Sequence, residues 1–134
     1  MRDTCLCLHT QRAARALARR FDEALRPLGL NNGQFSLLMA LNRPKPPRIG
    51  NVAVLLVMDR TTLTAKLKPL VRRGLVKVRL DAADKRIRHP VLTRAGKAAL
   101  SAALPVWERE HAAIEDLVAG PNGDRLRADL NALC

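Results

Sequence analysis

The chain has 134 residues, of which 48% are hydrophobic and 27% are charged, a balance that is ordinary for one globular domain. This composition excludes a disordered or fibrous protein, and the longest apolar run, residues 52–58, is far shorter than the ~20 residues that a membrane-spanning helix needs. Arginines interrupt the first 30 residues, where a signal peptide would need an apolar core, so we expect a cytoplasmic protein.

The positive charge lies in the middle of the chain. The formal net charge is +12, and residues 43–97 contain 15 lysines and arginines against three aspartates, whereas the two flanking segments together carry no net charge. A basic segment of this kind favours a polyanion, because each phosphate that it neutralises releases condensed counterions. Nucleic acid is therefore the leading partner, and an anionic membrane surface is the next candidate.

The N-terminal part of the chain predicts three helices. Apolar residues recur at spacings of four and three over residues 10–26, which indicates an amphipathic helix. Asn31 or Asn32 is placed to cap a second helix, whose inner face would hold Phe35, Leu38 and Leu41. After a proline-rich connector at residues 44–47, a short third helix fits residues 49–55.

A fourth helix is predicted to begin after Asp59, an acidic N-cap that the helix dipole favours. Leucines at i, i+4 and i+7 would face the core, namely Leu63, Leu67 and Leu70. The opposite face is then polar and basic, and it carries Thr61, Lys68 and Arg72. Pro69 lies inside this helix and should bend or loosen it, because proline cannot donate a backbone hydrogen bond.

The next segment predicts a β-hairpin. Gly74 ends the fourth helix, and apolar residues then alternate with basic ones over residues 76–80, which is typical of a strand. A turn signal at residues 81–84 leads to a second alternating segment, residues 87–92. The tip between them is basic, with Lys85, Arg86 and Arg88. We therefore expect a hairpin with the shape and charge of a wing.

A last long helix should begin after Thr93 and end near Gly120 and Pro121. Its apolar positions follow spacings of four and three, as in a coiled-coil seam, through Leu100, Leu104, Trp107, His111, Ile114 and Val118. Such a seam favours a dimer contact, and an intrachain core is the alternative. Pro105 should kink this helix, and a short terminal helix would carry Leu126, Leu130 and Leu133.

The order of these elements predicts a mainly α fold with a small β-hairpin wing, an α+β winged helix-turn-helix. A duplex major groove accepts one α-helix, and a thin hairpin can reach the neighbouring minor groove. Threonine hydroxyls on the fourth helix could contact base edges, while its cations reach guanine or phosphates and an arginine of the wing enters the minor groove. The candidate DNA-binding residues are Arg60, Thr61, Thr62, Thr64, Lys66, Lys68, Arg72, Lys85, Arg86 and Arg88.

The chain resembles the MarR family of bacterial winged-helix transcriptional regulators over nearly its whole length. DRTTLTAKLKPLVRRGLVKVRLDAADKRIRHPVLTRAG, residues 59–96, is similar to the family's recognition helix, wing and closing motif, and LGLNNGQFSLLMAL, residues 28–41, adds a second match. The resemblance implies a homodimer made by dimerisation helices in residues 1–30 and 98–134, with a DNA-binding lobe in residues 31–97 of a single 1–134 domain. It also implies that Asp84 braces the wing together with Arg86.

The sequence departs from the family pattern in two places. NVAVLLVMD, residues 51–59, lacks the glycine or polar turn often found before the recognition helix, which leaves the path of the turn open. The N-terminal arm carries Cys5-Leu6-Cys7, which could form a thiol sensor, alone or with Cys134 of a second chain, or could be small apolar filler. The spacing of cysteines and histidines matches no zinc pattern, so we expect no metal and no cofactor.

The family resemblance further implies a crevice between the dimer helices and the DNA-binding lobe, where small aromatic acids or other effectors lower DNA affinity. Candidate residues at its border are His9, Phe35, Trp107 and His111. The alternative is that these aromatic residues belong to the core, as aromatic residues at helical spacing more often do.

We therefore expect a sequence-specific transcriptional regulator that binds a pseudo-palindromic operator in double-stranded DNA as a homodimer, with no membrane partner. It should act as a repressor that a small-molecule effector or thiol oxidation relieves. The alternatives are a non-specific architectural DNA-binding protein and, less favoured, a cysteine-dependent enzyme. We expect no enzyme, because no histidine or acid lies at a recognisable motif spacing from Cys5 or Cys7.

Overall fold

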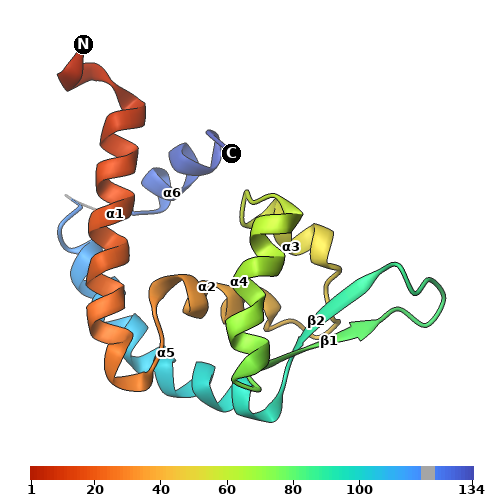
Figure 1. Cartoon of the computed structure of the whole chain (residues 1–134). Helices are drawn as coiled ribbons and strands as arrows, with labels where there is room; N and C mark the ends of the chain where they lie inside the picture. Colours follow the sequence, from red (N-terminus) through yellow and green to blue (C-terminus); the bar gives the residue numbers. More distant parts are fainter. Residues whose placement is uncertain (119–122) are drawn as a thin grey trace.

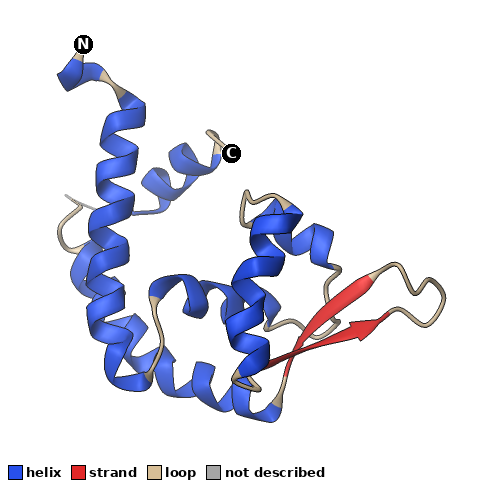
Figure 2. Cartoon of the chain, viewed as in Figure 1, coloured by secondary structure: helices blue, strands red, loops and turns tan. Residues whose placement is uncertain are grey.

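The computed structural model describes residues 1–118 and 123–134. Helix α1 runs along one side of the molecule and α5 crosses its lower end, while the β-hairpin projects on the side opposite α1 (Figures 1 and 2). Within the described residues the elements follow in the order η1 (Arg2–Thr4), α1 (Leu6–Leu25), η2 (Arg26–Leu28), α2 (Asn32–Leu41), α3 (Ile49–Leu55), α4 (Arg60–Arg72), β1 (Val76–Leu80), β2 (Arg88–Leu92), α5 (Arg94–Glu115) and α6 (Gly123–Asn131).

Helix α1 begins earlier than the apolar spacing predicted, at Leu6 rather than near residue 10. The reason is an N-cap that the pattern did not indicate, because the Cys5 sulfur accepts a hydrogen bond from the Leu8 N–H. Only Phe21 and Leu25 of α1 are buried, at the C-terminal end. The expected inner face therefore exists over only part of the helix, and Leu17 is 40% exposed.

The core lies where the C-terminal end of α1 meets α2, α4, α5 and the base of the hairpin. Asn31 caps α2 in a reciprocal capping box with Gln34, so the predicted asparagine cap is confirmed at the first of the two candidates. The apolar faces predicted for α2 and α4 are confirmed as well, since every leucine and phenylalanine named for them is buried. The residues with almost no exposure include Leu25, Leu38, Leu63, Leu70 and Val76.

The turn between α3 and α4 places a valine in the left-handed backbone region. Val57 has φ 51° and is 68% exposed, and the Met58 N–H closes the turn on the Ala53 carbonyl at 2.9 Å. The sequence had left this path open because it offers no glycine there. The structure makes the tight turn anyway, with a β-branched side chain in a conformation that L-residues avoid.

Val57→Gly should therefore stabilise the protein. Removing the side chain removes a strain energy of roughly 1 kcal/mol that valine has in the left-handed region. Part of this gain is offset, because glycine also gives the unfolded chain more freedom. Urea unfolding followed by circular dichroism measures the change. The control is Val54→Gly, on the exposed side of α3, which should lose up to about 0.5 kcal/mol, because glycine is a weaker helix former than valine. Equal losses from both variants would contradict the assignment of strain to Val57.

The hairpin is confirmed, but its outer part has less cover than the alternation predicted. β1 and β2 pair antiparallel, from Val76 opposite Leu92 to Leu80 opposite Arg88. Val76 is buried, whereas Val78 and Leu80 are 42% and 57% exposed, because the hairpin extends beyond the body of the molecule.

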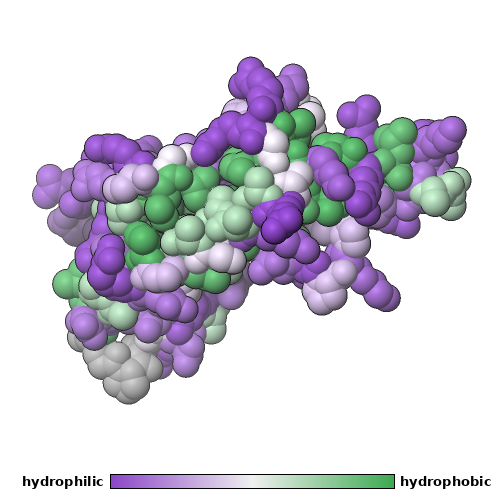
Figure 3. Space-filling model, turned by 90° about the horizontal axis from the view of Figure 1, so that it is seen from below, coloured by the Kyte–Doolittle hydropathy of each residue, from purple (hydrophilic) through white to green (hydrophobic). Residues whose placement is uncertain are grey.

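Seen from below, apolar side chains form an interrupted band across the molecule, with hydrophilic side chains on either side (Figure 3).

Helix α5 starts where the sequence predicted and ends earlier. The Thr93 hydroxyl accepts from the Gly96 N–H at 3.0 Å and donates to the Gly74 carbonyl, and the helix ends at Glu115. The predicted end at Gly120 and Pro121 lies outside the described residues. Helices α4 and α5 continue through Pro69 and Pro105.

The apolar seam of α5 is only partly available to a second chain. Leu100 is buried in the core of its own chain, and Trp107 and Ile114 pack against that core, because α5 crosses both α1 and α2. The intrachain alternative therefore holds for Leu100, whereas Trp107 and Ile114 are only half-buried in the single chain and the dimer contact stays a prediction. The leucines of the terminal helix segment are different, since Leu126, Leu130 and Leu133 are 42–64% exposed.

Candidate nucleic-acid interface

The outer face of α4 is a polar, basic surface that no other described element covers. Asp59 caps the helix: its carboxylate accepts from the Thr62 N–H at 2.7 Å and from the Thr62 hydroxyl at 2.6 Å, and these bonds lower the pKa of Asp59. The hydroxyl of Thr62 is thus already engaged in the cap. The other candidates on this helix are exposed, namely Arg60, Thr61, Thr64, Lys66, Lys68 and Arg72.

Four arginines from three elements gather beside the N-terminal end of α4. They surround a hollow of about 290 Å³ and come from the residue before α3, the first residue of α4 and the wing; they are Arg48, Arg60, Arg86 and Arg88. No acidic side chain lines this arginine hollow. The Arg60 guanidinium lies close to Gly50, where a Cβ atom would come within 2.9 Å of it. Arg86 is paired with Asp84, whereas Arg48, Arg60 and Arg88 form no ion pair within the described residues, and such a cluster of cations is suited to a phosphate group.

Arg48 was missed by the sequence analysis. It stands at the end of the proline-rich connector, outside both predicted DNA-binding elements, and its position beside Arg60 depends on how α3 packs against α4. The concentration of charge in residues 43–97 was the signal that could have included it.

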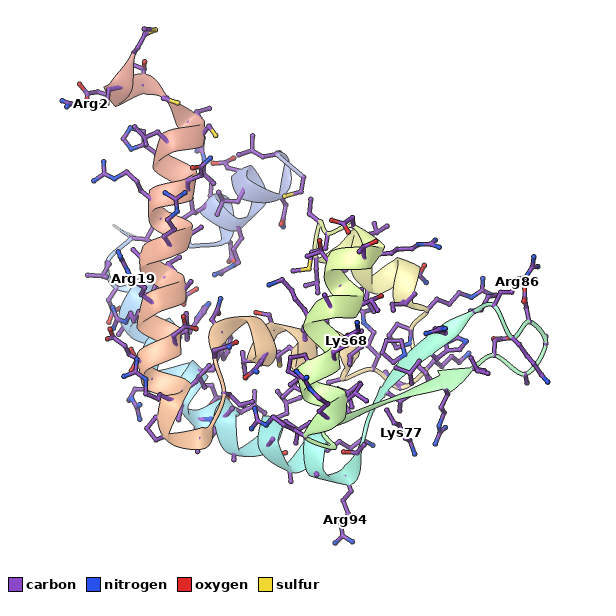
Figure 4. The ribbon with its side chains drawn as sticks, viewed as in Figure 1. Arg2, Arg19, Lys68, Lys77, Arg86 and Arg94 are labelled. Atoms are coloured by element: carbon purple, nitrogen blue, oxygen red, sulfur yellow. The ribbon has the colours of Figure 1, made fainter. Side chains whose placement is uncertain are left out.

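The wing turn is held by an acid–base pair that the sequence did single out. Both oxygens of Asp84 accept from the Arg86 guanidinium, at 3.1 and 3.0 Å, and one also accepts from the Arg86 N–H at 3.0 Å. The bonds lower the pKa of Asp84 and raise that of Arg86. Arg86 remains 91% exposed at the far end of the wing, so it is oriented by Asp84 without being hidden from a partner (Figure 4).

A second polar pair at the base of the wing turn was missed. His89 Nε2 lies 2.9 Å from an Asp81 carboxylate oxygen, and His89 Nδ1 lies 3.2 Å from the Pro47 carbonyl. The hydrogen bond with His89 is the main reason that the pKa of Asp81 falls to about 2, and the same bond raises the pKa of His89. The fold brings these groups together from the connector and both sides of the hairpin, and no sequence pattern indicates that contact.

Three of the four residues proposed to border an effector crevice meet in the structure. The rings of Phe35 and Trp107 are 6.3 Å apart and stacked, and those of Trp107 and His111 are 4.6 Å apart. A hollow of about 370 Å³ opens beside Phe35 and Trp107, between α2, the end of α3 and α5. His9 does not line it, because it lies near the start of α1 with Nε2 3.1 Å from the Asp3 carbonyl oxygen.

All three cysteines are free and exposed. Cys5 caps α1, the Cys7 sulfur accepts from the side-chain amide of Gln11 at 3.2 Å, and the Cys134 thiol donates to the Leu130 carbonyl at 3.7 Å. Two of the three thiols therefore lie at the beginning of α1.

A helix-turn-helix of α3 and α4, followed by a basic antiparallel hairpin, defines a winged-helix DNA-binding protein. A family model described as MarR family matches residues 28–87. None of the curated protein sequences matches the chain. In the described part of the chain, no helix combines the length and apolar character that a bilayer span requires.

Solved structures show the same relationship over the whole chain. The Mycobacterium tuberculosis transcriptional regulator MosR, in a complex with DNA, is 39% identical, with 96% of this chain and 92% of that chain covered and a TM-score of 0.85. The transcriptional repressor CouR, bound to a 23-mer DNA duplex, is 26% identical, with 98% and 93% covered and a TM-score of 0.86. A probable transcriptional regulator from Pseudomonas aeruginosa, at 24% identity and a TM-score of 0.87, covers both chains fully and shows the same fold.

The chain belongs to the MarR family of DNA-binding transcriptional regulators.

Proposed function

We propose that this protein is a repressor that binds a pseudo-palindromic operator as a homodimer. The observation that carries the proposal is the continuous cationic surface formed by the outer face of α4 and the arginine hollow. One helix would enter the major groove, while Arg86 and Arg88 on the wing reach the minor groove beside it. Two such lobes, related by a two-fold axis, would require two half-sites in the DNA.

The exposed apolar side chains at both ends of the chain support the dimer. In α1 these are Leu6 and Leu17, and after α5 they are Leu117, Leu126, Leu130 and Leu133. The charges of the two ends are also opposite, since residues 1–42 carry an excess of arginine and residues 98–134 an excess of acid. We propose that residues 1–30 and 98–134 of two chains pack together, leaving residues 31–97 as the DNA-binding lobe. Sedimentation equilibrium should then give twice the mass of one chain.

The function is tested with the DNA upstream of the protein's own coding sequence. At one fixed salt concentration, fluorescence anisotropy should show binding roughly a thousandfold tighter to that duplex than to a scrambled duplex of equal length. Equal affinity for the two would favour the alternative of an architectural DNA-binding protein. Binding to neither would overturn the proposal and leave the cysteine-dependent enzyme to be considered.

Thiol oxidation is the form of control for which the structure offers a physical route. Joining Cys5 to Cys7, or either to Cys134 of a second chain, removes the sulfur cap of α1 and alters the end of the proposed dimer contact. Mild oxidation should weaken operator binding by roughly 5- to 150-fold, the usual range of allosteric coupling, and the Cys5→Ser/Cys7→Ser variant should not respond. Chains of monomer size on a non-reducing gel after oxidation would exclude the disulfide between two chains. An unchanged operator affinity after oxidation would exclude control by either disulfide.

Binding of a small aromatic acid or a related effector is the other proposed control. The hollow beside Phe35 and Trp107 lies between α5 and the DNA-binding lobe, so a ligand there could change the angle between them. Quenching of the fluorescence of Trp107, the one tryptophan of the chain, gives a direct readout of such binding.

A further inference from the structure

A chain of polar contacts runs from the connector before α3 to the tip of the wing. The Pro46 and Pro47 carbonyls lie 3.3 and 3.2 Å from His89 Nδ1, and His89 Nε2 lies 2.9 Å from Asp81. The other oxygen of Asp81 accepts from the Ala83 N–H at 2.9 Å and the Asp84 N–H at 3.1 Å. Asp84 in turn orients Arg86, so His89 is the link between the connector and this series of bonds.

The imidazole of His89 can satisfy all of these partners only when it is protonated. Its neighbours on both sides are acceptors, because a proline carbonyl has no proton to give and the pKa of Asp81 of about 2 keeps that side chain a carboxylate. A neutral imidazole has one N–H, whereas the imidazolium has two. Loss of the proton therefore removes one of the two bonds and leaves two acceptors facing each other.

We propose that His89 is a positioning residue for DNA binding, whose imidazolium joins the wing to the connector so that both present their cations to the duplex as one surface. The inference rests on the DNA-binding role argued above. The position of the connector matters for DNA binding because Arg48 directly follows it and lines the arginine hollow with Arg86 and Arg88. A wing that moves independently of the connector would separate these cations from one another.

The charges around His89 act in both directions. Asp81 favours the imidazolium directly, and Asp84 lies beyond it. The cations of the surrounding elements oppose the imidazolium. His89 lines a groove of about 850 Å³ together with three cations of the segment between α2 and α3, namely Arg43, Lys45 and Arg48. Arg79 lies opposite His89 on β1, and Arg88 precedes it on β2. The hydrogen bond with Asp81 outweighs both these cations and the desolvation of the ring, since the pKa of His89 is raised from 6.5.

The sign of the pH dependence follows from this raised pKa. The bond network is complete below pH 6.5, and it is lost as the pH rises through the raised pKa of folded His89. We expect operator affinity to weaken by about tenfold between pH 6 and pH 9, the usual value of one charge-assisted hydrogen bond. His89→Gln, which donates one bond and does not titrate, should bind more weakly at pH 6 and show almost no pH dependence.

The measurement uses anisotropy at constant salt in a Cys5→Ser/Cys7→Ser/Cys134→Ser background, which removes the thiols from the titration. His9→Gln is the matched control, because it removes an exposed imidazole far from the wing and should keep the wild-type slope. Equal slopes for wild type and His89→Gln would overturn the proposal.

A second readout does not depend on DNA. Titration of the imidazole carbon protons by NMR should give a pKa above 6.5 for His89, lowered in Asp81→Asn, and the wing amide signals should shift with the same midpoint. A protein that binds no duplex but shows this titration would contradict the proposed function and leave the link intact. A His89 pKa at or below 6.5 would contradict the link itself.

Discussion

Gly96→Ala should destabilise the protein by roughly 3 kcal/mol or more, and it is the largest stability effect that we expect from one methyl group. Gly96 lies in the first turn of α5, directly against the backbone of Leu75, and an added Cβ would overlap the Leu75 carbonyl oxygen. That carbonyl also accepts from the Thr93 N–H at 3.1 Å. The carbonyl oxygen and carbon of Leu75 belong to the backbone and cannot turn aside as a side chain would. The junction of the wing with α5 must therefore shift.

Gly33→Ala is the matched control for this effect. Gly33 also lies in the first turn of a helix, but a Cβ there meets only the Asn31 side-chain oxygen at 3.5 Å, an ordinary contact. Alanine at that position should be neutral or stabilising by up to about 1 kcal/mol, as in other helices. Urea unfolding of both variants gives the comparison. Similar stabilities for the two variants would mean that α5 does not approach Leu75 closely enough for an added methyl group to clash.

Arg60→Ala and Arg88→Ala should each weaken operator binding by roughly 5- to 150-fold, the usual range for an arginine at a base edge or a phosphate. Both side chains line the arginine hollow, one from α4 and one from the wing. If the lost contact is to a phosphate, the slope of log K against log salt should also fall by about one. Anisotropy titrations at several salt concentrations measure both quantities.

Arg94→Ala is the control for charge alone. Arg94 is exposed at the start of α5 and points away from α4 and from the wing (Figure 4). Its removal lowers the net charge by the same amount and should change operator affinity little. A loss as large as that of Arg60→Ala would show that general attraction, rather than the face formed by α4 and the wing, dominates binding.

Local chemistry made much of the fold predictable. The caps at Asn31, Asp59 and Thr93 are short-range signals, because each side chain bonds a backbone N–H three residues further on. The strand alternation and the basic turn were equally local. These local signals alone are enough to place the candidate DNA-binding residues on exposed positions of α4 and the wing.

The features that the sequence did not predict all depend on contacts between distant segments. Leu100 and Trp107 belong partly to the core of their own chain because α5 crosses α1 and α2, which helical spacing alone cannot show. His89 acquires its role from Pro47 on another loop. Arg48 joins Arg60 through the packing of α3 on α4, and a single sequence carries no sign of that approach.

The most direct test of the DNA-binding face is hydrogen–deuterium exchange of the protein with and without its upstream duplex. Protection should concentrate on peptides from residues 60–72 and 81–92, with little change in peptides from the first turns of α5 around Arg94. Protection confined to α1 or α5, with α4 and the wing exchanging as in the free protein, would contradict the account.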